Sequence, residues 1–305
     1  MFTTRRDILR LGASGAALLI AGCSPRALFA QAPTDQRLVF VLLRGAMDGL
    51  HAVPAIGDPG YARARGQIAV TEGVHRLDST FGLHPKLPQL AQLYDAREAL
   101  IAHAVATPYR GRSHFDGQNC LEIGGDVPYE RDDGWLNRFV QLLGGEPAIA
   151  LSETIPLALR GSAEVGSYGV SRRQVPDEDL LARVTQLYAP DARLRPLWQE
   201  ALESVEIAGG FGDNQGGRGE GARLAQLVAQ FLNAPEGARI AMVESDGWDT
   251  HQGQEGRLDH KFDEFDGFLA GLKTGLGANW SRTLVFITTE FGRTVAVNGT
   301  GGTDH

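Results

Sequence analysis

Four short apolar runs divide this chain of 305 residues, and each is followed at once by a dense group of polar side chains. Unbroken apolar runs of this length are typical of strands that are buried on both faces, as in parallel sheets. Segments with apolar residues at helical spacing lie between them. Alternating strands and helices favour an α/β fold with three layers, α/β/α, around a mostly parallel sheet. The predicted strands are 38–43, 99–105, 238–243 and 283–288.

The middle of the chain has a different organisation. Residues 145–235 hold a short extended part, several helical patterns and a loop at 209–221 that contains seven glycines. The loop lacks the Gly-Lys-Ser/Thr ending of a phosphate-binding loop, so we interpret it as a flexible connection. We expect a single domain over residues 37–305 with a helical insertion at about 145–235. The predicted helices are 87–94, 114–123, 135–143, 179–188, 194–205, 222–232 and 257–272.

The net charge excludes some classes of partner. With 29 basic and 37 acidic side chains, the formal charge is −8, and no basic stripe is present. An acidic protein of this kind is a poor general binder of nucleic acid or anionic lipid. We therefore expect no nucleic-acid partner. Beyond the first residues no apolar run is long enough for a membrane span, so no transmembrane segment is expected in the mature chain.

The first 32 residues have the pattern of an export signal. Arg5 and Arg6 precede a weakly apolar run at 11–21, which is too short to cross a bilayer. The pattern predicts a twin-arginine signal, the twin-arginine translocase as a partner during export, and a periplasmic or extracellular protein. Two processing sites remain open: Ala30-Gln31-Ala32 fits a signal peptidase, whereas Cys23 fits a lipoprotein site that would leave a lipid anchor.

The polar groups that follow the strands predict where a ligand binds. In open α/β sheets, ligands bind at the carboxyl ends of the strands. Four polar groups at four such ends should therefore meet in space. Together they bring acidic and imidazole side chains, namely Asp48, Asp116, Asp246, Asp249, Glu290 and Asp304 with His114, His251 and His305.

This composition predicts a site for a divalent metal. Clustered carboxylates repel one another unless a cation balances them. Mixed His and carboxylate ligands suit zinc, manganese or iron better than calcium, although calcium remains a candidate. The alternative is that the acids cap turns and pair with Arg44, Arg112 and Arg293, since Asp and Gly are common turn residues. The predicted metal ligands are Asp48, Asp246, Asp249, His251, Glu290 and His305.

Ser113 and Arg112 are the candidate catalytic residues. Ser113 directly precedes a predicted helix, so it can serve as a plain N-cap. The free backbone N–H groups of a helix start also attract anions such as phosphate or sulfate. A serine at that position can act as a nucleophile that a metal activates. The planar guanidinium of Arg112 can hold an anionic substrate.

Six motifs in this order resemble a bacterial exported family, domain of unknown function 1501. The resemblance covers residues 37–305, and the twin-arginine start fits it too. The family is similar to the alkaline phosphatase and sulfatase superfamily, which implies an alkaline-phosphatase-like fold with a metal site at the strand ends. The motifs are Arg44-Gly-Ala-Met-Asp-Gly-Leu50, Arg112-Ser-His-Phe-Asp116, Asp133-Gly-Trp-Leu-Asn-Arg138, Asp249-Thr-His251, Thr289-Glu-Phe-Gly-Arg-Thr294 and Gly302-Thr-Asp-His305.

The resemblance implies roles for particular residues. Asp48 matches the first metal-binding acid of the superfamily, and Ser113 matches its nucleophile, with Gly124 closing the helix that follows. Asp246 or Asp249, together with His251, matches one metal position, and Glu290 matches a later acid. The superfamily has Asp-His at that later position, whereas Phe291 follows Glu290 here, so Asp304 or His305 would replace the missing ligand. The family continues beyond the last motif, so we expect the chain to be truncated at its C-terminus.

Two functions from different classes follow. The first is an exported, metal-dependent hydrolase of phosphate or sulfate esters, which takes a small anionic ester as substrate. The second is a non-catalytic binding or assembly protein that keeps a degenerate phosphatase-like site and recognises a glycan or holds a structural metal. The Phe291 departure motivates the second function.

Overall fold

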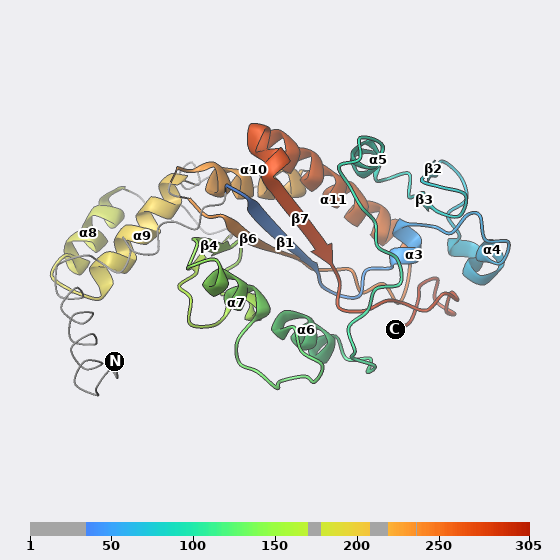
Figure 1. Cartoon of the computed structure of the whole chain (residues 1–305), viewed down its shortest axis with the longest axis horizontal. Helices are drawn as coiled ribbons and strands as arrows, with labels where there is room; N and C mark the ends of the chain where they lie inside the picture. Colours follow the sequence, from blue (N-terminus) through green and yellow to red (C-terminus); the bar gives the residue numbers. More distant parts are fainter. Residues whose placement is uncertain (1–34, 170–177, 208–218, 236) are drawn as a thin grey trace, which may run out of the picture.

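The computed structural model describes residues 35–169, 178–207, 219–235 and 237–305 (Figure 1). The predicted signal and Cys23 lie outside the described residues. The main sheet has five parallel strands in the order β5–β4–β6–β1–β7. These strands are β1 (Arg37–Leu43), β4 (Ala148–Ala150), β5 (Gly166–Ser167), β6 (Ile240–Ser245) and β7 (Thr283–Thr288).

Three of the four predicted strands are confirmed. β1 corresponds to the run 38–43, β6 to the run 238–243 and β7 to the run 283–288. Because β1 pairs with β6 on one side and β7 on the other, Phe40 lies level with Met242 and Phe286. The interior strand β1 is buried on both faces, which is why its sequence has no polar residue between Leu38 and Leu43.

The fourth predicted strand, 99–105, is wrong. This segment has no regular structure, and Leu100 and Val105 are 92% and 75% exposed. Ala104 has a positive φ of 55°, which interrupts an extended strand. The His103 ring stacks on Phe81 with ring centroids 3.9 Å apart. An apolar run becomes a strand only when a sheet edge accepts it, and here a local aromatic contact and a turn take its place.

All seven predicted helices are confirmed, with ends that differ by a few residues. The largest difference is at α11, which starts after Gly253 and ends before Gly277, both with φ near 54°. Among the described residues the α-helices are α3 (Gly49–Ala52), α4 (Tyr61–Arg65), α5 (Pro88–Asp95), α6 (His114–Ile123), α7 (Trp135–Leu142), α8 (Glu178–Tyr188), α9 (Leu194–Ile207), α10 (Glu220–Asn233) and α11 (Gln254–Leu276).

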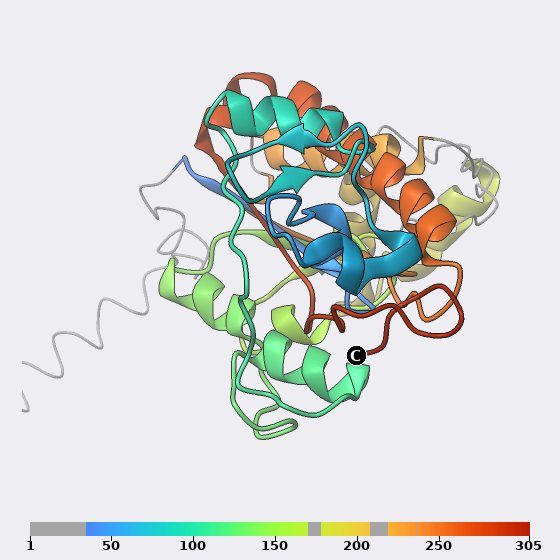
Figure 2. The ribbon, with the colours of Figure 1, turned by 90° about the vertical axis from the view of Figure 1, so that its right-hand side faces the viewer.

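Helices cover both faces of the sheet, so the three-layer arrangement is present (Figure 1). Val39 and Val41 face the core formed with α10 and α11, whereas Phe40 and Leu42 face the core formed with α7 and the short helix η3 (Leu157–Leu159). A small antiparallel pair, β2 (His75–Arg76) and β3 (Gly82–Leu83), lies beside α5 (Figure 2). Two further short helices are η2 (Gly66–Ile68) and η4 (Gly277–Arg282).

The segment predicted as a helical insertion contributes to two regions. β4 and β5 pair into the main sheet, and α10 packs against it. α8 and α9 lie at one end of the molecule, away from the sheet (Figure 1). The Trp198 indole N–H donates to Thr185 Oγ1 at 2.8 Å, and the Trp198 ring packs edge-on against Tyr188. These contacts join α8 to α9.

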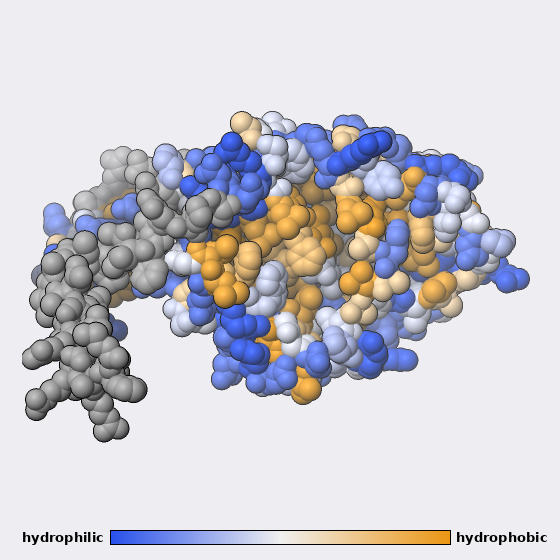
Figure 3. All heavy atoms as spheres, viewed as in Figure 1, coloured by the Kyte–Doolittle hydropathy of each residue, from blue (hydrophilic) through white to orange (hydrophobic). Residues whose placement is uncertain are grey.

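β7 is the edge strand of the sheet. Its Leu284 and Phe286 side chains are 65% and 45% exposed, although Phe286 stacks on Phe40. Apolar side chains gather on this face of the molecule (Figure 3). Within the described part of the chain, no helix has both the length and the apolar character needed to span a bilayer.

Candidate metal centre

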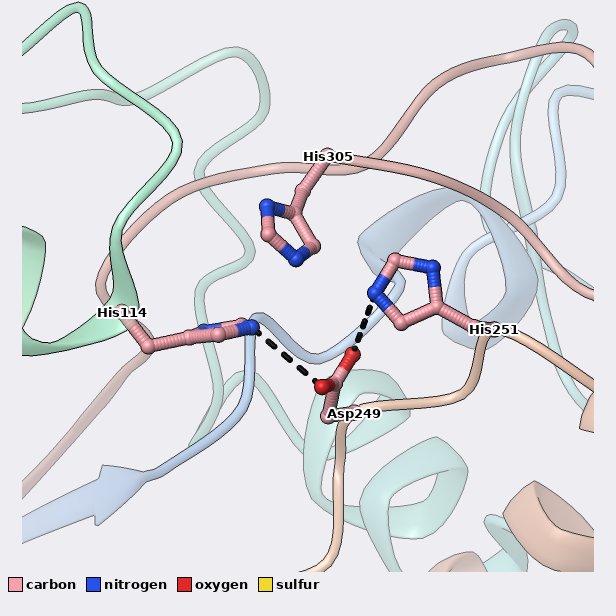
Figure 4. A group of neighbouring side chains, drawn as sticks. All are labelled: His114, Asp249, His251 and His305. Carbon is pink, nitrogen blue, oxygen red and sulfur yellow. Dashed lines mark ion pairs between the residues drawn. The ribbon is translucent and has the colours of Figure 1, made fainter.

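Three histidines and one aspartate converge on one point (Figure 4). His114 is the first residue of α6, and Asp249 and His251 lie on the loop between β6 and α11. His305 comes from the loop after β7. One ligand atom from each of the four side chains lies within 4.8 Å of the other three. Among the described residues, this is the group that has the spacing of a metal site.

Close backbone packing brings the β6–α11 loop to the end of β1. Gly45 has a φ of 114°, and a Cβ atom there would lie 2.5 Å from the backbone nitrogen of Asp249. Glycine is therefore required at this position, because its small size allows the approach and its flexibility allows the φ angle. Trp248 is 1% exposed and anchors the loop in the core next to Asp249. Asp249 is thus held in place from both sides.

The start of α6 positions His114. Ser113 is the N-cap, and its Oγ accepts a hydrogen bond from the backbone N–H of Asp116 at 3.3 Å. The Phe291 ring stacks on the His114 ring with centroids 5.0 Å apart. A Cβ atom at Gly117 would lie 2.8 Å from the Phe291 ring, so this glycine lets α6 approach the loop after β7.

Carboxylates orient two of the imidazoles. His114 Nδ1 lies 2.8 Å from Glu290 Oε1, and His251 Nδ1 lies 3.1 Å from Asp304 Oδ1. An ionised carboxylate only accepts, so each Nδ1 carries a proton and donates to the carboxylate behind it. Both Nε2 atoms face Asp249, at 3.4 Å for His114 and 3.1 Å for His251. Carboxylates behind metal-binding histidines commonly fix the tautomer in this way.

Glu290 is ionised in this setting. It is 1% exposed, and its Oε1 also accepts from Gly45 N and Gln118 Nε2, both at 2.9 Å. Burial alone would raise its pKa, but hydrogen bonds from the backbone, Gln118 and His114 bring the pKa below its ordinary value. The structure therefore places Glu290 behind His114 rather than among the four converging donors.

Arg293 balances Asp249. The Arg293 side chain is fully buried, its Nη2 donates to Asp249 Oδ1, and its Nη1 donates to the carbonyl of Thr303 at 2.5 Å. Burial raises the pKa of Asp249, but the hydrogen bond and charge of Arg293 more than offset this, and the pKa is lowered. Asp249, Glu290 and Asp304 together outnumber this single guanidinium, so the centre keeps an excess of negative charge that a cation would balance.

Two imidazole nitrogens in the centre make no hydrogen bond. Within the described residues, His114 Nε2 and His305 Nδ1 are buried and make no hydrogen bond. Burial is the main cause that lowers the pKa of His305, and the nearby charge of Arg293 adds to it. A buried polar atom without a partner is costly and calls for an explanation. Imidazole nitrogens that converge on a shared point and make no hydrogen bond are the donors that a metal ion requires, so the residues fit a metal.

The loop of residues 294–305 docks on the β6–α11 loop through hydrogen bonds. Asn298 Nδ2 donates to the His251 carbonyl at 2.8 Å and to Asp304 Oδ1 at 3.0 Å. Asn298 Oδ1 accepts from the backbone N–H groups of Thr300 and Gly302. A Cβ atom at Gly302 would lie 2.3 Å from the His251 carbonyl, so only glycine permits this approach. The docked loop carries Asp304 and His305 into the centre.

Asp48 lies outside the converging group. Its Oδ1 accepts from the backbone N–H groups of Leu50 and His51 as the N-cap of α3, and its Oδ2 accepts from Arg65 at 2.6 Å and Gln254 at 2.7 Å. Gln254 Oε1 in turn accepts from Thr303 Oγ1 at 2.7 Å. Asp48 therefore belongs to a buried polar network, which links α3 and α4 to the loops that carry His251 and His305.

The remaining predicted residues lie around the centre or apart from it. Asp246 is exposed near the end of β6, and Arg112 is exposed before α6. Ser113 directly precedes His114. Three of the predicted metal ligands, Asp249, His251 and His305, lie in the converging group. The prediction omitted the fourth member, His114, although the sequence analysis placed it in the same polar group. Its position directly after an N-cap serine was the available signal, because a helix start fixes a side chain more firmly than a loop does.

The buried side chain of His51 leads to a prediction of how the free energy of unfolding changes with pH. His51 is fully buried, and both ring nitrogens lack a hydrogen-bond partner among the described residues. Burial lowers its pKa to about 4, and Asp48, His84 and Arg65 also act on it. Below its ordinary pKa near 6.5 the unfolded chain binds a proton that the folded chain does not. We expect the free energy of unfolding to fall by about 2 kcal/mol between pH 7 and pH 5.

Urea unfolding at the two pH values measures this effect. His51→Leu should reduce the loss, whereas His260→Leu, at a 68% exposed position, should leave it unchanged. The pKa of His84 is also lowered, mainly by burial, so part of the loss should remain in His51→Leu. If His51→Leu had the same pH dependence as the unmodified chain, His51 would not be its source.

A comparison with protein families gives one match. The family model described as "Protein of unknown function (DUF1501)" matches residues 96–305, which include all four converging side chains. No curated protein and no solved structure matches the chain.

Proposed function

The chain belongs to the family described as protein of unknown function DUF1501, and we propose that it is an exported, metal-dependent hydrolase of phosphate or sulfate esters. The observation that carries this proposal is the convergence of His114, Asp249, His251 and His305 on one point, with carboxylates behind two of the imidazoles. The twin-arginine pathway carries folded proteins. The twin-arginine pattern therefore supports export of a chain that has already assembled its centre.

The donor set favours particular metals. Three imidazoles and one carboxylate suit zinc, manganese or iron, whereas calcium prefers oxygen ligands almost exclusively. When bound, such an ion would supply Lewis-acid stabilisation of charge on a phosphoryl or sulfuryl oxygen. The centre is open to solvent on one side, since the side chains of Asp249 and His251 are 42% and 44% exposed. A small anionic ester can therefore reach it.

Ser113 and Arg112 are the proposed catalytic residues. Ser113 Oγ would attack phosphorus or sulfur, so that an Oγ–P or Oγ–S bond forms while the ester bond breaks. The proton of the hydroxyl leaves with the departing alcohol. Water then displaces Ser113, which restores its hydroxyl and releases phosphate or sulfate. The exposed guanidinium of Arg112 is free to approach an anionic group of the substrate.

Metal content and ester turnover test this proposal together. We expect the purified protein to hold about one equivalent of zinc, manganese or iron by elemental mass spectrometry. It should hydrolyse p-nitrophenyl phosphate or p-nitrophenyl sulfate, and a chelator should abolish turnover. Ser113→Ala should remove turnover but keep the metal, because the Ser113 hydroxyl is not among the four donors. Unchanged turnover in Ser113→Ala would remove Ser113 from this role.

A second candidate function is a non-catalytic binding protein with a structural metal. One observation favours it: Ser113 Oγ accepts the backbone N–H of Asp116, so the hydroxyl already has a structural task as an N-cap. Metal at full occupancy, no turnover of any ester and saturable binding of glycans would favour this function. Turnover by a monodisperse sample that is lost on chelation would exclude it.

A further inference from the structure

The loop of residues 294–305 is held on the surface by hydrogen bonds rather than by apolar packing. Gly253 N and Gln254 N donate to the carbonyls of Thr300 and Gly301, and Thr303 N donates to the carbonyl of Thr250. Several of its side chains are exposed, including Val295 at 53%. Segments with few buried apolar contacts open at low free energy. A segment that is held mainly by hydrogen bonds is suited to undock from the rest of the centre.

Docking of this loop carries a penalty that a metal would remove. The docked loop places the His305 ring 4.3 Å from the His114 ring and 4.8 Å from the His251 ring, centroid to centroid. In this arrangement His305 Nδ1 and His114 Nε2 are buried without a hydrogen bond. Undocking would expose both nitrogens to water. A metal ion that they ligate would satisfy them only in the docked state, and a ligand shifts an equilibrium through such a difference in affinity.

Asn298 is the residue that joins the loop to the centre. Its side chain makes bonds in both directions: Oδ1 accepts from Thr300 and Gly302 within the loop, and Nδ2 donates to the His251 carbonyl and to Asp304 Oδ1. Asp304 Oδ1 also accepts a hydrogen bond from His251 Nδ1. Asn298 thus fixes the carboxylate that fixes the tautomer of His251. It touches none of the four donor atoms, so it acts through its neighbours.

From these contacts we propose that metal binding and docking of the 294–305 loop are one coupled event, with Asn298 as the positioning residue that couples them. The proposal rests on the proposed metal centre and adds a form of regulation to it. Without metal the loop undocks and His305 leaves the centre. With metal the loop closes, and the centre gains His305 and the Asp304–His251 contact.

Zinc affinity and hydrogen exchange test the coupling in the full chain. We expect zinc to protect the backbone amides of 294–305 from exchange in the unmodified protein. Asn298→Ala should bind zinc about 10- to 100-fold more weakly in competition with a chelator, which is typical for loss of an outer partner. With cobalt in place of zinc, the absorption spectrum of Asn298→Ala at saturating metal should match that of the unmodified protein, because the four donors are intact.

Two further variants keep the test sharp. Asn279→Ala is the matched control, since Asn279 Nδ2 makes one exposed bond to Asn233 Oδ1 away from the centre. It should bind zinc normally. Gly302→Ala should weaken zinc binding like Asn298→Ala, because its Cβ would collide with His251 and undock the loop. Thermal unfolding without metal should be similar for all variants if the loop contributes little to global stability.

The outcomes separate the coupling from the proposed function. Zinc binding with no change in exchange at 294–305 overturns the coupling and leaves the metal centre intact. Normal zinc affinity in Asn298→Ala overturns the role of Asn298. No binding of zinc, manganese, iron or cobalt by the unmodified protein overturns the metal centre, and the coupling with it.

Discussion

His114→Ala is expected to weaken zinc binding by at least about 100-fold. Loss of an outer partner already costs about 10- to 100-fold in metal affinity, and His114 Nε2 is a proposed direct ligand. In the described part of the chain the neighbouring carboxylate is Glu290, and Gly45 and Gln118 already engage it, so it is not free to replace His114. Competition with a chelator measures the change, and elemental analysis should show loss of metal from the purified variant.

Comparison variants separate a ligand from its support. Glu290→Gln should weaken zinc binding only about 10-fold, because an amide oxygen still accepts a hydrogen bond from His114 Nδ1. His260→Ala should have no effect, because His260 is 68% exposed on α11. Zinc binding by His114→Ala that equals that of the unmodified chain would contradict the centre as described. An equal loss in His114→Ala and Glu290→Gln would contradict the assignment of Glu290 as a support rather than a ligand.

The sequence predicted most of the fold because unbroken apolar runs leave a clear signal. β1, which is buried on both faces, has no charge between Leu38 and Leu43, and β7 has none between Thr283 and Thr288 although Leu284 and Phe286 are exposed. The run 99–105 has the same composition but is exposed. The composition of a segment indicates that it can form a strand. Whether it pairs depends on whether an unpaired edge of the sheet lies close to it. β4 and β5 were predicted only as a short extended part without bounds, because two or three residues carry no periodic pattern.

The candidate site was predictable in part for a related reason. Position after a strand correctly indicated that Asp249 and His251 lie near the carboxyl edge of the sheet. Position alone does not give the direction of a side chain. Asp48 follows β1 just as closely, but its carboxylate turns inward to cap α3 and to meet Arg65. The buried partner of Asp48 lies 17 residues away along the chain, and no local pattern identifies it.

Breaking the buried Asp48–Arg65 ion pair is expected to lower the free energy of unfolding strongly. Both side chains are almost fully buried, at 2% and 0% exposed, with Arg65 Nη2 and Asp48 Oδ2 2.6 Å apart. Arg65→Met should lower the free energy of unfolding by about 3–5 kcal/mol, because it leaves a buried carboxylate without its counter-charge. Arg65 Nη1 also reaches the carbonyls of Thr294 and Val295, which adds to the loss. Urea unfolding at pH 7 measures the difference.

The double variant Asp48→Leu/Arg65→Met distinguishes a missing charge partner from a poor fit. Replacing both members of a buried pair by apolar residues is often close to neutral, so the double variant should recover much of the stability that Arg65→Met loses. Recovery will be incomplete, because Gln254 loses its acceptor on Asp48 and α3 loses its cap. A loss below about 1 kcal/mol in Arg65→Met would mean that Asp48 is compensated in another way, and a metal ion would then be the first candidate to examine. Zinc binding that survives in the double variant would instead assign Asp48 to the scaffold that holds the loops of His251 and His305, and not to the ligands.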